Sequence, residues 1–583
     1  MWQTDTGKRD YLPHLGASVE NIVVSPQGSS YAVRLDDNST MVLSTAEMKP
    51  TCYVSGLQSF TFGDRPRKDD DRQLWKLREG ISQPLTAAIS PTDPSRLLLA
   101  VGGGRRGFLA GVSPSTALLQ SFDLSVFQSI AKQPLARTHP TDVNQALDDS
   151  PITEPTVTHL CVSHDGRWMA SVDEWQPPAR DYREIEGIVS SEDWACGRRE
   201  IHLKFWECPA DDGAFELVSR INEAHMTKQA ERIFSMVADK RSSRFVTLGD
   251  DSMVRFWRPT TRQADGVAST GADGRPLVSW ACVQSVSLGR SFATVTNDMP
   301  LGSLAAGNRS GSLAFSEDGS TLFAAFSNQD EGVLYVVDAE TGEVRDELHS
   351  LFSGELRGIA CLSSYVILLT ADLTVYDVVA DELQYGYQLR HKTGSGGSRM
   401  AQLAVNELSG TFAVAVPLQG THYGKSRKGH TSEVAVFSPG QSQPLLLKSF
   451  NHLVISLLPA VGSGGFLVVD AAAQVWSLSE ETEPAPLVQP LAELSLDTSD
   501  EMETPMANGT VALALSGGDA SEDEQEEVDD EASDYDVHAA VIAPQHLADI
   551  FNTAPAYAMP PIEDVFYQVA ALLSTNLPST TVR

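Results

Sequence analysis

One unit recurs along this chain and constrains its fold more than any other feature. An apolar run is followed by a polar turn with Asp, Gly or Pro, and then by a second run rich in β-branched and aromatic residues. Copies begin at Asn21 (NIVVSPQGSSYAVRL), Ala87 (AAISPTDPSRLLLAV), His159 (HLCVSHDGRWMASV), Phe234 (FSMVADKRSSRFVTLGDD), Ser312 (SLAFSEDGSTLFAAF) and Gln402 (QLAVNELSGTFAVAV). Short runs between turn residues are typical of strands, and helical periodicity is scarce before residue 540. We therefore expect an all-β fold.

Several units continue into a further strand that ends near an aromatic residue. Examples are IHLKFWE at Ile201–Glu207 and DSMVRFWRP at Asp251–Pro259. An Asp followed by a strand that closes on Trp resembles the WD-repeat blade, and Asp251–Trp257 is the best match. The resemblance implies a WD-repeat-like β-propeller in which the Asp caps a tight turn and the Trp packs between neighbouring blades. Most units lack the Gly-His pair and the terminal Trp-Asp, and insertions stretch their spacing beyond the usual ~40–45 residues.

The number of units predicts more than one ring. At ~40–45 residues per blade, the chain before its acidic tail could supply about eleven blades, whereas a propeller closes with about 4–8. We expect the last blades of a partial first β-propeller at 1–130, a polar linker at 131–155 and a complete second β-propeller at 156–480. An incomplete ring leaves raw sheet edges, and Trp2–Gly7 already reads as the end of a blade. We therefore expect the first blades to be missing from this sequence.

The charge of the chain is strongly acidic and unevenly placed. Lys and Arg number 43 against 77 Asp and Glu, a net charge of −34, which disfavours coating of a phosphate backbone by the whole molecule. In Ser521–Asp536, ten of the sixteen residues are acidic. This run predicts a disordered acidic linker at 481–540. It is either a simple solvating tail or a regulated segment, with Ser521 and Ser533 as candidate phosphorylation sites for acidophilic kinases.

A short helical segment is expected at 541–583. Its apolar residues repeat at helical spacing on one face, and Glu563 and Asp564 stand in the first turn, where the helix dipole favours them. This face predicts a docking helix, which packs either on its own propeller or in the groove of a partner. The residues of the candidate docking helix are Ile562, Val565, Phe566, Val569, Leu572 and Leu573.

No motif predicts catalysis, a cofactor or a metal site. Gly102–Gly107 (GGGRRG) follows a strand, but the next residues are again strand-like, whereas a phosphate loop needs a helix there. The six cysteines lack zinc spacing, and the chain holds no H-E-x-x-H or G-x-S-x-G motif. We therefore expect no enzyme and no small-molecule substrate. The start has no signal-peptide pattern and no run reaches eighteen apolar residues, so we expect no membrane contact.

Basic residues occur in small groups that could contact RNA or a protein partner. Solvated loops are the simpler explanation, whereas clustering on one propeller face would create a contact for an RNA backbone. The candidate contact residues are Arg198, Arg199, Lys240, Arg241, Arg244, Lys425, Arg427 and Lys428.

Both ends of the chain and one internal stretch resemble a known family. They are WQTDTGKRDYLPHLGASVENIVVSPQGSSYAVRLDDNSTMVLS from Trp2, THLCVSHDGRWMASVDEW from Thr158, and DIFNTAPAYAMPPIEDVFYQVAALL from Asp549. They resemble the nucleolar tandem-propeller WD-repeat subunits of the t-UTP (UtpA) subcomplex of the small-subunit processome, the NET-associated nuclear protein family. The family has two full propellers, and here the first is truncated.

The resemblance implies a non-catalytic scaffold in the nucleus and nucleolus. Its implied partners are other WD-repeat subunits of the t-UTP/UtpA complex, pre-rRNA and the small nucleolar RNP. Its implied roles are ribosome biogenesis through 18S rRNA maturation, and coupling to RNA polymerase I transcription. Two alternatives stay open, an adaptor of a ubiquitin ligase and a cytoplasmic coat or scaffold. A ligase adaptor would be expected to show Trp-Asp-x-Arg, yet Trp257 is followed by Arg258 and Pro259.

Overall fold

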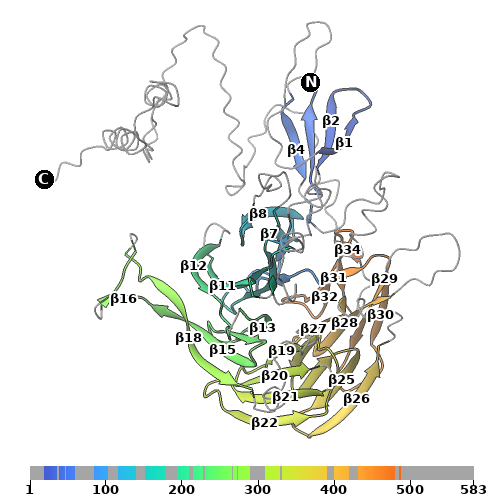
Figure 1. Ribbon diagram of the computed structural model, residues 1–583. Coiled ribbons are helices and arrows are strands. Elements are labelled where there is room, and N and C mark those ends of the chain that lie inside the picture. Colours follow the sequence, from blue (N-terminus) through green and yellow to red (C-terminus); the bar gives the residue numbers. More distant parts are fainter. Residues whose placement is uncertain are drawn as a thin grey trace. The chain divides into compact units, whose positions relative to one another are not determined.

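The chain folds entirely into β-sheets within the part that the structure describes. This computed structural model describes residues 19–35, 38–45, 48–54, 56–58, 84–102, 116–138, 152–178, 194–195, 197–208, 215–227, 230–264, 267–271, 274–288, 309–328, 331–389, 400–418, 431–479 and 485–487. In these residues, 34 strands form eight four-stranded antiparallel sheets and one two-stranded ribbon (Figure 1). The predicted all-β fold is confirmed, and the four-stranded sheets are consistent with the blades of a WD-repeat propeller.

The strands of each sheet follow one another along the chain, apart from one ribbon inserted between β15 and β18. The first two sheets are β1 (Val19–Val24), β2 (Ser30–Leu35), β3 (Thr40–Ser44), β4 (Pro50–Val54); and β5 (Ala87–Ile89), β6 (Arg96–Val101), β7 (Leu118–Asp123), β8 (Gln128–Pro134). The next two are β9 (Thr156–Val162), β10 (Trp168–Trp175), β11 (Glu200–Glu207), β12 (Glu216–Asn222); and β13 (Ile233–Ala238), β14 (Phe245–Gly249), β15 (Met253–Thr261), β18 (Val278–Ser287).

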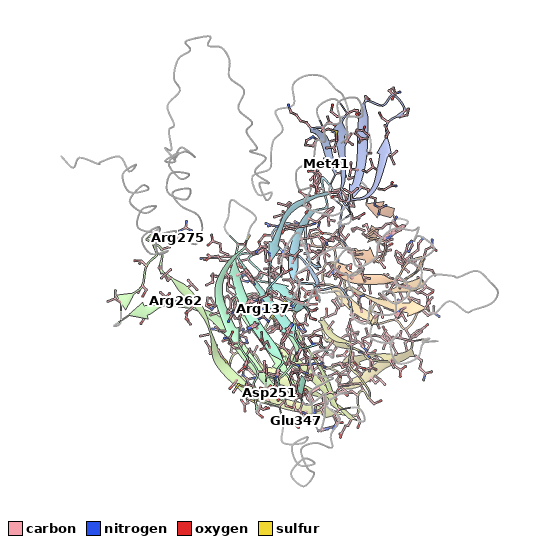
Figure 2. All side chains as sticks on the ribbon, turned by 45° about the horizontal axis from the view of Figure 1, so that its top comes forward. Met41, Arg137, Asp251, Arg262, Arg275 and Glu347 are labelled. Atoms are coloured by element: carbon pink, nitrogen blue, oxygen red, sulfur yellow. The ribbon has the colours of Figure 1, made fainter. Side chains whose placement is uncertain are left out.

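The remaining sheets have the same plan. They are β19 (Arg309–Phe315), β20 (Thr321–Asn328), β21 (Glu331–Asp338), β22 (Val344–His349); β23 (Gly358–Leu362), β24 (Tyr365–Leu369), β25 (Asp372–Asp377), β26 (Glu382–Gln388); β27 (Gln402–Asn406), β28 (Thr411–Leu418), β29 (Thr431–Phe437), β30 (Leu446–Phe450); and β31 (Val454–Pro459), β32 (Phe466–Asp470), β33 (Val475–Leu478), β34 (Ala485–Leu487). The ribbon pairs β16 (Gln263–Ala264) with β17 (Val267–Ala268). Arg262 lies between β15 and β16, and Arg275 between β17 and β18 (Figure 2).

The recurring polar turn joins the first two strands of a sheet. Between β19 and β20, Gly319 has φ of +70°, a conformation that favours glycine. The hydroxyl of Ser316 donates to Asp318 Oδ1 at 2.6 Å, and the Ser320 N–H reaches the same oxygen at 3.2 Å. These hydrogen bonds lower the pKa of Asp318 to about 2. Local turn chemistry thus explains the Ser-x-Asp-Gly pattern of this hairpin, which recurs at 163–166 between β9 and β10.

Seven of the sheets close into a ring through their first strands, which we call the inner strands. In order, β5, β9, β13, β19, β23, β27 and β31 each contact the next, and β31 contacts β5. The closure includes a hydrogen bond of 2.7 Å from the Leu85 N–H to the Ile455 carbonyl, and Leu97 shares a buried core with Ile455 and Val469. The sheet β5–β8 therefore belongs to the same ring as the later sheets.

This arrangement differs from the boundaries expected from the sequence. The sheet β5–β8 was assigned to a separate propeller at 1–130, and the linker at 131–155 overlaps β8. The strand is the outermost of its sheet and is only partly covered, so its residues are as polar as those of a loop. Similarly, β34 lies inside the stretch 481–540 that the sequence predicts to be disordered, yet it pairs with β33. The full division into propellers stays a prediction.

The sheet β1–β4 has a small core of its own, formed by Val33, Leu35 and Leu43. The segment after it connects to the ring, where Leu57 packs in the core of β6 and β7. The Gln58 N–H also donates to Gln120 Oε1 at 2.9 Å.

The chain divides into two compact units, Met1–Ala514 and Leu515–Arg583. The second unit lies outside the described residues, and so do the candidate docking helix, Ser521 and Ser533.

Candidate functional site

A buried hydrogen-bond network occupies the third sheet of the ring. The ring nitrogen Nε2 of His225, between β12 and β13, lies 2.8 Å from Thr247 Oγ1 on β14. Its Nδ1 lies 2.8 Å from Asp251 Oδ1 in the β14–β15 turn. Trp257 on β15 donates its indole N–H to Thr247 Oγ1 at 2.9 Å. The network thus joins β14, β15 and the turn between them to the loop that enters the sheet.

The electrostatics of this network favour a neutral imidazole. Burial lowers the pKa of His225 more than the hydrogen bond and charge of Asp251 raise it, because only 1% of this residue is exposed. A proton on Nδ1 lets the imidazole donate to Asp251 and accept from Thr247, while Arg255 donates to the other oxygen of Asp251 at 2.7 Å. A side chain at Gly249 would collide with His225, since a Cβ there would lie 2.2 Å from Nδ1. The network therefore holds this part of the sheet together.

Asp251 and Trp257 have the two roles that the WD-repeat resemblance implies. Asp251 caps the turn by accepting the Met253 N–H at 3.2 Å, and Trp257 contacts Phe205 of the preceding sheet with ring centroids 6.0 Å apart. The sequence reasoning missed His225 and Thr247. The Gly-His pair of a WD-repeat blade would mark this histidine, but here Ala224 precedes His225 in place of Gly. The remaining sequence signal was the spacing of 26 residues between His225 and Asp251.

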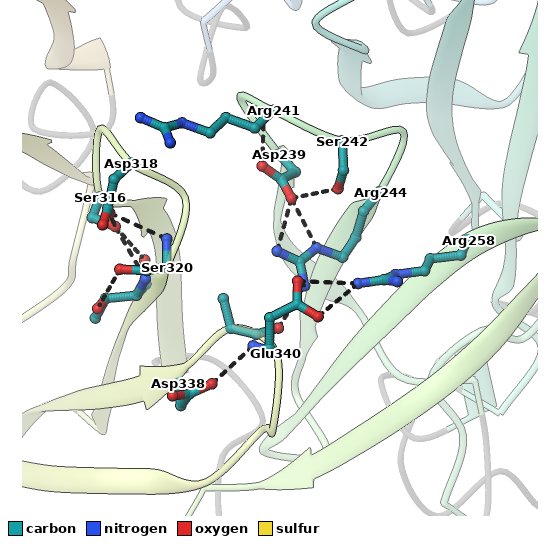
Figure 3. Close-up of polar contacts among 12 residues, drawn as sticks. Asp239, Arg241, Ser242, Arg244, Arg258, Ser316, Asp318, Ser320, Asp338 and Glu340 are labelled. Atoms are coloured by element: carbon teal, nitrogen blue, oxygen red, sulfur yellow. Dashed lines mark hydrogen bonds and ion pairs between the residues drawn. The ribbon is translucent and has the colours of Figure 1, made fainter.

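Arg244, a candidate RNA contact, is instead buried between two sheets (Figure 3). Its guanidinium donates to Asp239 Oδ2 at 2.7 Å and to the Ala339 carbonyl at 2.5 Å. It also lies 3.2 Å from Glu340, to which Arg258 binds as well. The guanidinium therefore links the β13–β14 turn to the next sheet, and its donors are used inside the fold.

Lys240 and Arg241 stand in the same turn and are more accessible. Lys240 forms an ion pair with Glu407 in the β27–β28 turn. Arg241 is exposed, and Figure 3 shows its side chain extending away from Asp239. Its charge contributes to the lowered pKa of Asp318 in the neighbouring turn.

Arg198 and Arg199 lie in the connection between β10 and β11. The guanidinium of Arg198 stacks 3.9 Å from the ring centroid of Trp194, a cation–π contact, and the residue is exposed. Arg199 is buried and pairs with Glu174 at 3.1 Å. Lys425, Arg427 and Lys428 lie outside the described residues.

The described basic candidates are separated onto the two ends of the ring. The first turns of neighbouring sheets lie at the same end, because Ser243 Oγ in the β13–β14 turn donates to Asp165 in the β9–β10 turn at 3.3 Å. Connections of an antiparallel sheet alternate between its ends. The β10–β11 connection with Arg198 and Arg199 is therefore at the opposite end from Lys240, Arg241 and Arg244.

Within the described ranges, no group of three or more His, Cys, Asp or Glu residues is arranged to hold a metal ion. The same residues include no helix of the length and apolar character needed to cross a membrane.

Comparison with known proteins finds distant relatives of the chain, although no protein-family model matches it. It is 23% identical to U3 small nucleolar RNA-associated protein 17 of Schizosaccharomyces pombe over 478 residues, 81% of this chain and 50% of that protein. It is 23% identical to WD repeat-containing protein 75 of Xenopus laevis over 43% of this chain and 24% of that protein. It is 21% identical to NET1-associated nuclear protein 1 of Saccharomyces cerevisiae over 58% of this chain and 35% of that protein. The chain spans half or less of the length of these curated relatives. The chain is thus a distant homologue of the WD-repeat t-UTP proteins, as the resemblance of its sequence predicted.

Proposed function

We propose that this protein is a non-catalytic scaffold subunit of the small-subunit processome, acting in pre-rRNA transcription and 18S rRNA maturation. The observation that carries the proposal is the homology over 81% of the chain to a protein named for its association with U3 small nucleolar RNA. The proposed partners are other WD-repeat subunits of the t-UTP/UtpA complex, pre-rRNA and the small nucleolar RNP. The proposed location is the nucleolus.

The way the ring uses its buried polar groups supports a scaffold role. His225 pairs with Asp251 inside one sheet, and Arg244 pairs with Asp239 and joins its turn to the next sheet. Such satisfied networks rigidify a fold. A rigid ring can bind several partners on its turns without rearrangement, and this is what an assembly platform needs.

The proposed contacts to RNA or protein partners are the accessible members of the basic candidate set. Among the described residues these are Arg198 and Arg241, which are exposed at opposite ends of the ring. Lys425, Arg427 and Lys428 stay predicted contacts, the docking helix at 541–583 stays a predicted partner site, and Ser521 and Ser533 stay predicted phosphorylation sites.

Affinity purification of the tagged full-length chain from growing cells tests the proposal. Bound proteins would be identified by mass spectrometry and bound RNA by sequencing, with and without RNase, and a tagged unrelated propeller protein would be the control. We expect WD-repeat processome subunits and the 5′ region of pre-rRNA to be recovered. Recovery of ubiquitin-ligase or coat subunits without pre-rRNA would refute the proposal, and nuclear exclusion of the tagged protein would also contradict it.

A further inference from the structure

Four arginines line one end of the ring on consecutive sheets, and we call them the arginine crescent. Arg232 directly precedes inner strand β13, Arg309 begins β19 and Arg357 directly precedes β23. These inner strands contact one another in this order (Figure 1), so each of three neighbouring sheets presents an arginine at the same end. The fourth member, Arg199, joins them from the β10–β11 connection.

The crescent is held in one electrostatic cluster by three carboxylates. Arg199 Nε and Arg232 Nε lie 3.1 and 3.4 Å from the same oxygen of Glu174. Arg309 Nη1 lies 3.4 Å from Asp250 Oδ1. Burial raises the pKa of Asp250 above its ordinary value, and the charges of Arg309, Arg232 and Arg199 oppose this rise. These three arginines therefore lie within electrostatic reach of one carboxyl group.

The fourth member also contacts a carboxylate. Arg357 Nη1 lies 2.6 Å from Glu355. Four guanidiniums are therefore gathered at one end of the ring in a chain with a net charge of −34.

Two members of the crescent keep most of their donors available. The side chains of Arg232 and Arg309 are 45% and 43% exposed, and each carboxylate contact uses one nitrogen at 3.4 Å, near the limit of a hydrogen bond. A guanidinium has five N–H donors. Arg167, at the opposite end of the ring, is different. It is equally exposed, but two of its nitrogens donate to Glu207 at 2.9 and 2.7 Å.

We infer that the arginine crescent binds the phosphate backbone of a single RNA strand, with Arg232 and Arg309 as the contacting residues. This inference rests on the proposed function, which supplies RNA as a partner. The guanidinium fork matches the oxygens of a phosphate, and successive sheets repeat it along a curved path. A phosphodiester chain has one negative charge per nucleotide, so its charges are evenly spaced along such a path. The spacing of charges in an acidic peptide depends on its sequence. Arg199 and Arg357 are mostly covered and hold the cluster in place.

The test measures binding of a fluorescent 20-nucleotide U-rich RNA to the purified full-length chain by anisotropy over a series of salt concentrations. The salt slope is the slope of log Kobs against log salt concentration, and each phosphate contact to a single strand contributes about 0.7 to its magnitude. Loss of two contacts therefore lowers the magnitude by about 1.4. If affinity at 1 M salt is unchanged, the variant binds ~25-fold more weakly than the unaltered chain at 0.1 M salt. We expect this change in R232Q/R309Q. R232K/R309K retains the charges and should retain most of the slope.

The matched control is R167Q/R345Q, which removes the same charge from exposed arginines at the opposite end of the ring. It should bind the RNA like the unaltered chain. If R232Q/R309Q does not fold, the single variants are each expected to lose about 0.7 in slope. Three results would each overturn the inference. The control could lose as much salt slope as R232Q/R309Q, or the unaltered chain could fail to bind the RNA. The unaltered chain could also bind a polyglutamate peptide more tightly than the RNA, with this binding abolished in R232Q/R309Q. Co-purification of processome subunits with R232Q/R309Q measures the proposed function separately, because protein partners can recruit the chain without this site.

Discussion

Replacing Thr247 by Val tests whether the His225 network stabilises the ring. Thr247 is fully buried, and its hydroxyl accepts the indole N–H of Trp257 and donates to His225 Nε2. Valine has nearly the same shape, so the change removes both hydrogen bonds without opening a cavity. Two buried groups then lack a partner, each at a cost of ~1–3 kcal/mol. We expect the free energy of unfolding to fall by about 2–6 kcal/mol.

Urea unfolding followed by tryptophan fluorescence measures this loss. The matched control is Thr260→Val on the neighbouring strand β15, because Thr260 is exposed and its hydroxyl lies 3.0 Å from the carbonyl and 3.4 Å from the Oγ of Ser279. A surface change of this kind should stay within about 0.5 kcal/mol. Thr247→Ser keeps the hydroxyl and should recover most of the stability. The reasoning fails if Thr247→Val is no worse than Thr260→Val, or if Thr247→Ser is as harmful as Thr247→Val.

Three further predictions concern charge, pH and assembly. Arg244→Gln should lower the free energy of unfolding in urea by ~3–5 kcal/mol, because it leaves Asp239 buried without its cation. Arg241→Gln should change this free energy by less than about 0.5 kcal/mol. Equal effects of the two changes would contradict the inference that Arg244 is buried and Arg241 is exposed. Burial holds the pKa of His225 below its ordinary value. As the pH falls below ~6.5, His225 therefore takes up a proton in the unfolded chain but stays neutral in the folded chain. Stability should therefore fall below that pH by up to about 1.4 kcal/mol per unit, and urea midpoints at two pH values should show a smaller fall in His225→Asn. Deletion of 549–583 should weaken co-purification of processome subunits while leaving the urea transition of the ring unchanged, and undiminished co-purification would sink this prediction.

Local features of the fold could be predicted from the sequence, because local chemistry determines them. Hairpins with Ser-x-Asp-Gly turns are visible because Gly319 and Asp318 stand within a few residues of their partners. Ring closure was not visible, because the contact between Leu85 and Ile455 joins distant parts of the chain. The sequence therefore groups β5–β8 with the segment 1–130, whereas in the structure β5 contacts both β9 and β31.

The candidate site was harder to predict, because exposure and not residue type decides what an arginine can bind. Arg241 and Arg244 belong to one basic group in the sequence, yet one is exposed and the other is held by Asp239 and Ala339. Arg232 and Arg309 were overlooked because each is isolated among polar neighbours. They approach each other only when β13 and β19 pack side by side.

The same distinction limits how strongly the described residues can bind RNA. A buried ion pair such as Arg244–Asp239 cannot exchange its carboxylate for a phosphate without leaving a buried charge unpaired, and this costs several kcal/mol. An exposed arginine with a long contact exchanges its partner at little cost. At the crescent end, Arg232 and Arg309 meet this condition, each with a carboxylate contact of 3.4 Å. One RNA strand on the crescent would therefore show a salt slope of about 1.4 in magnitude from these two contacts, and a larger slope would require further cations.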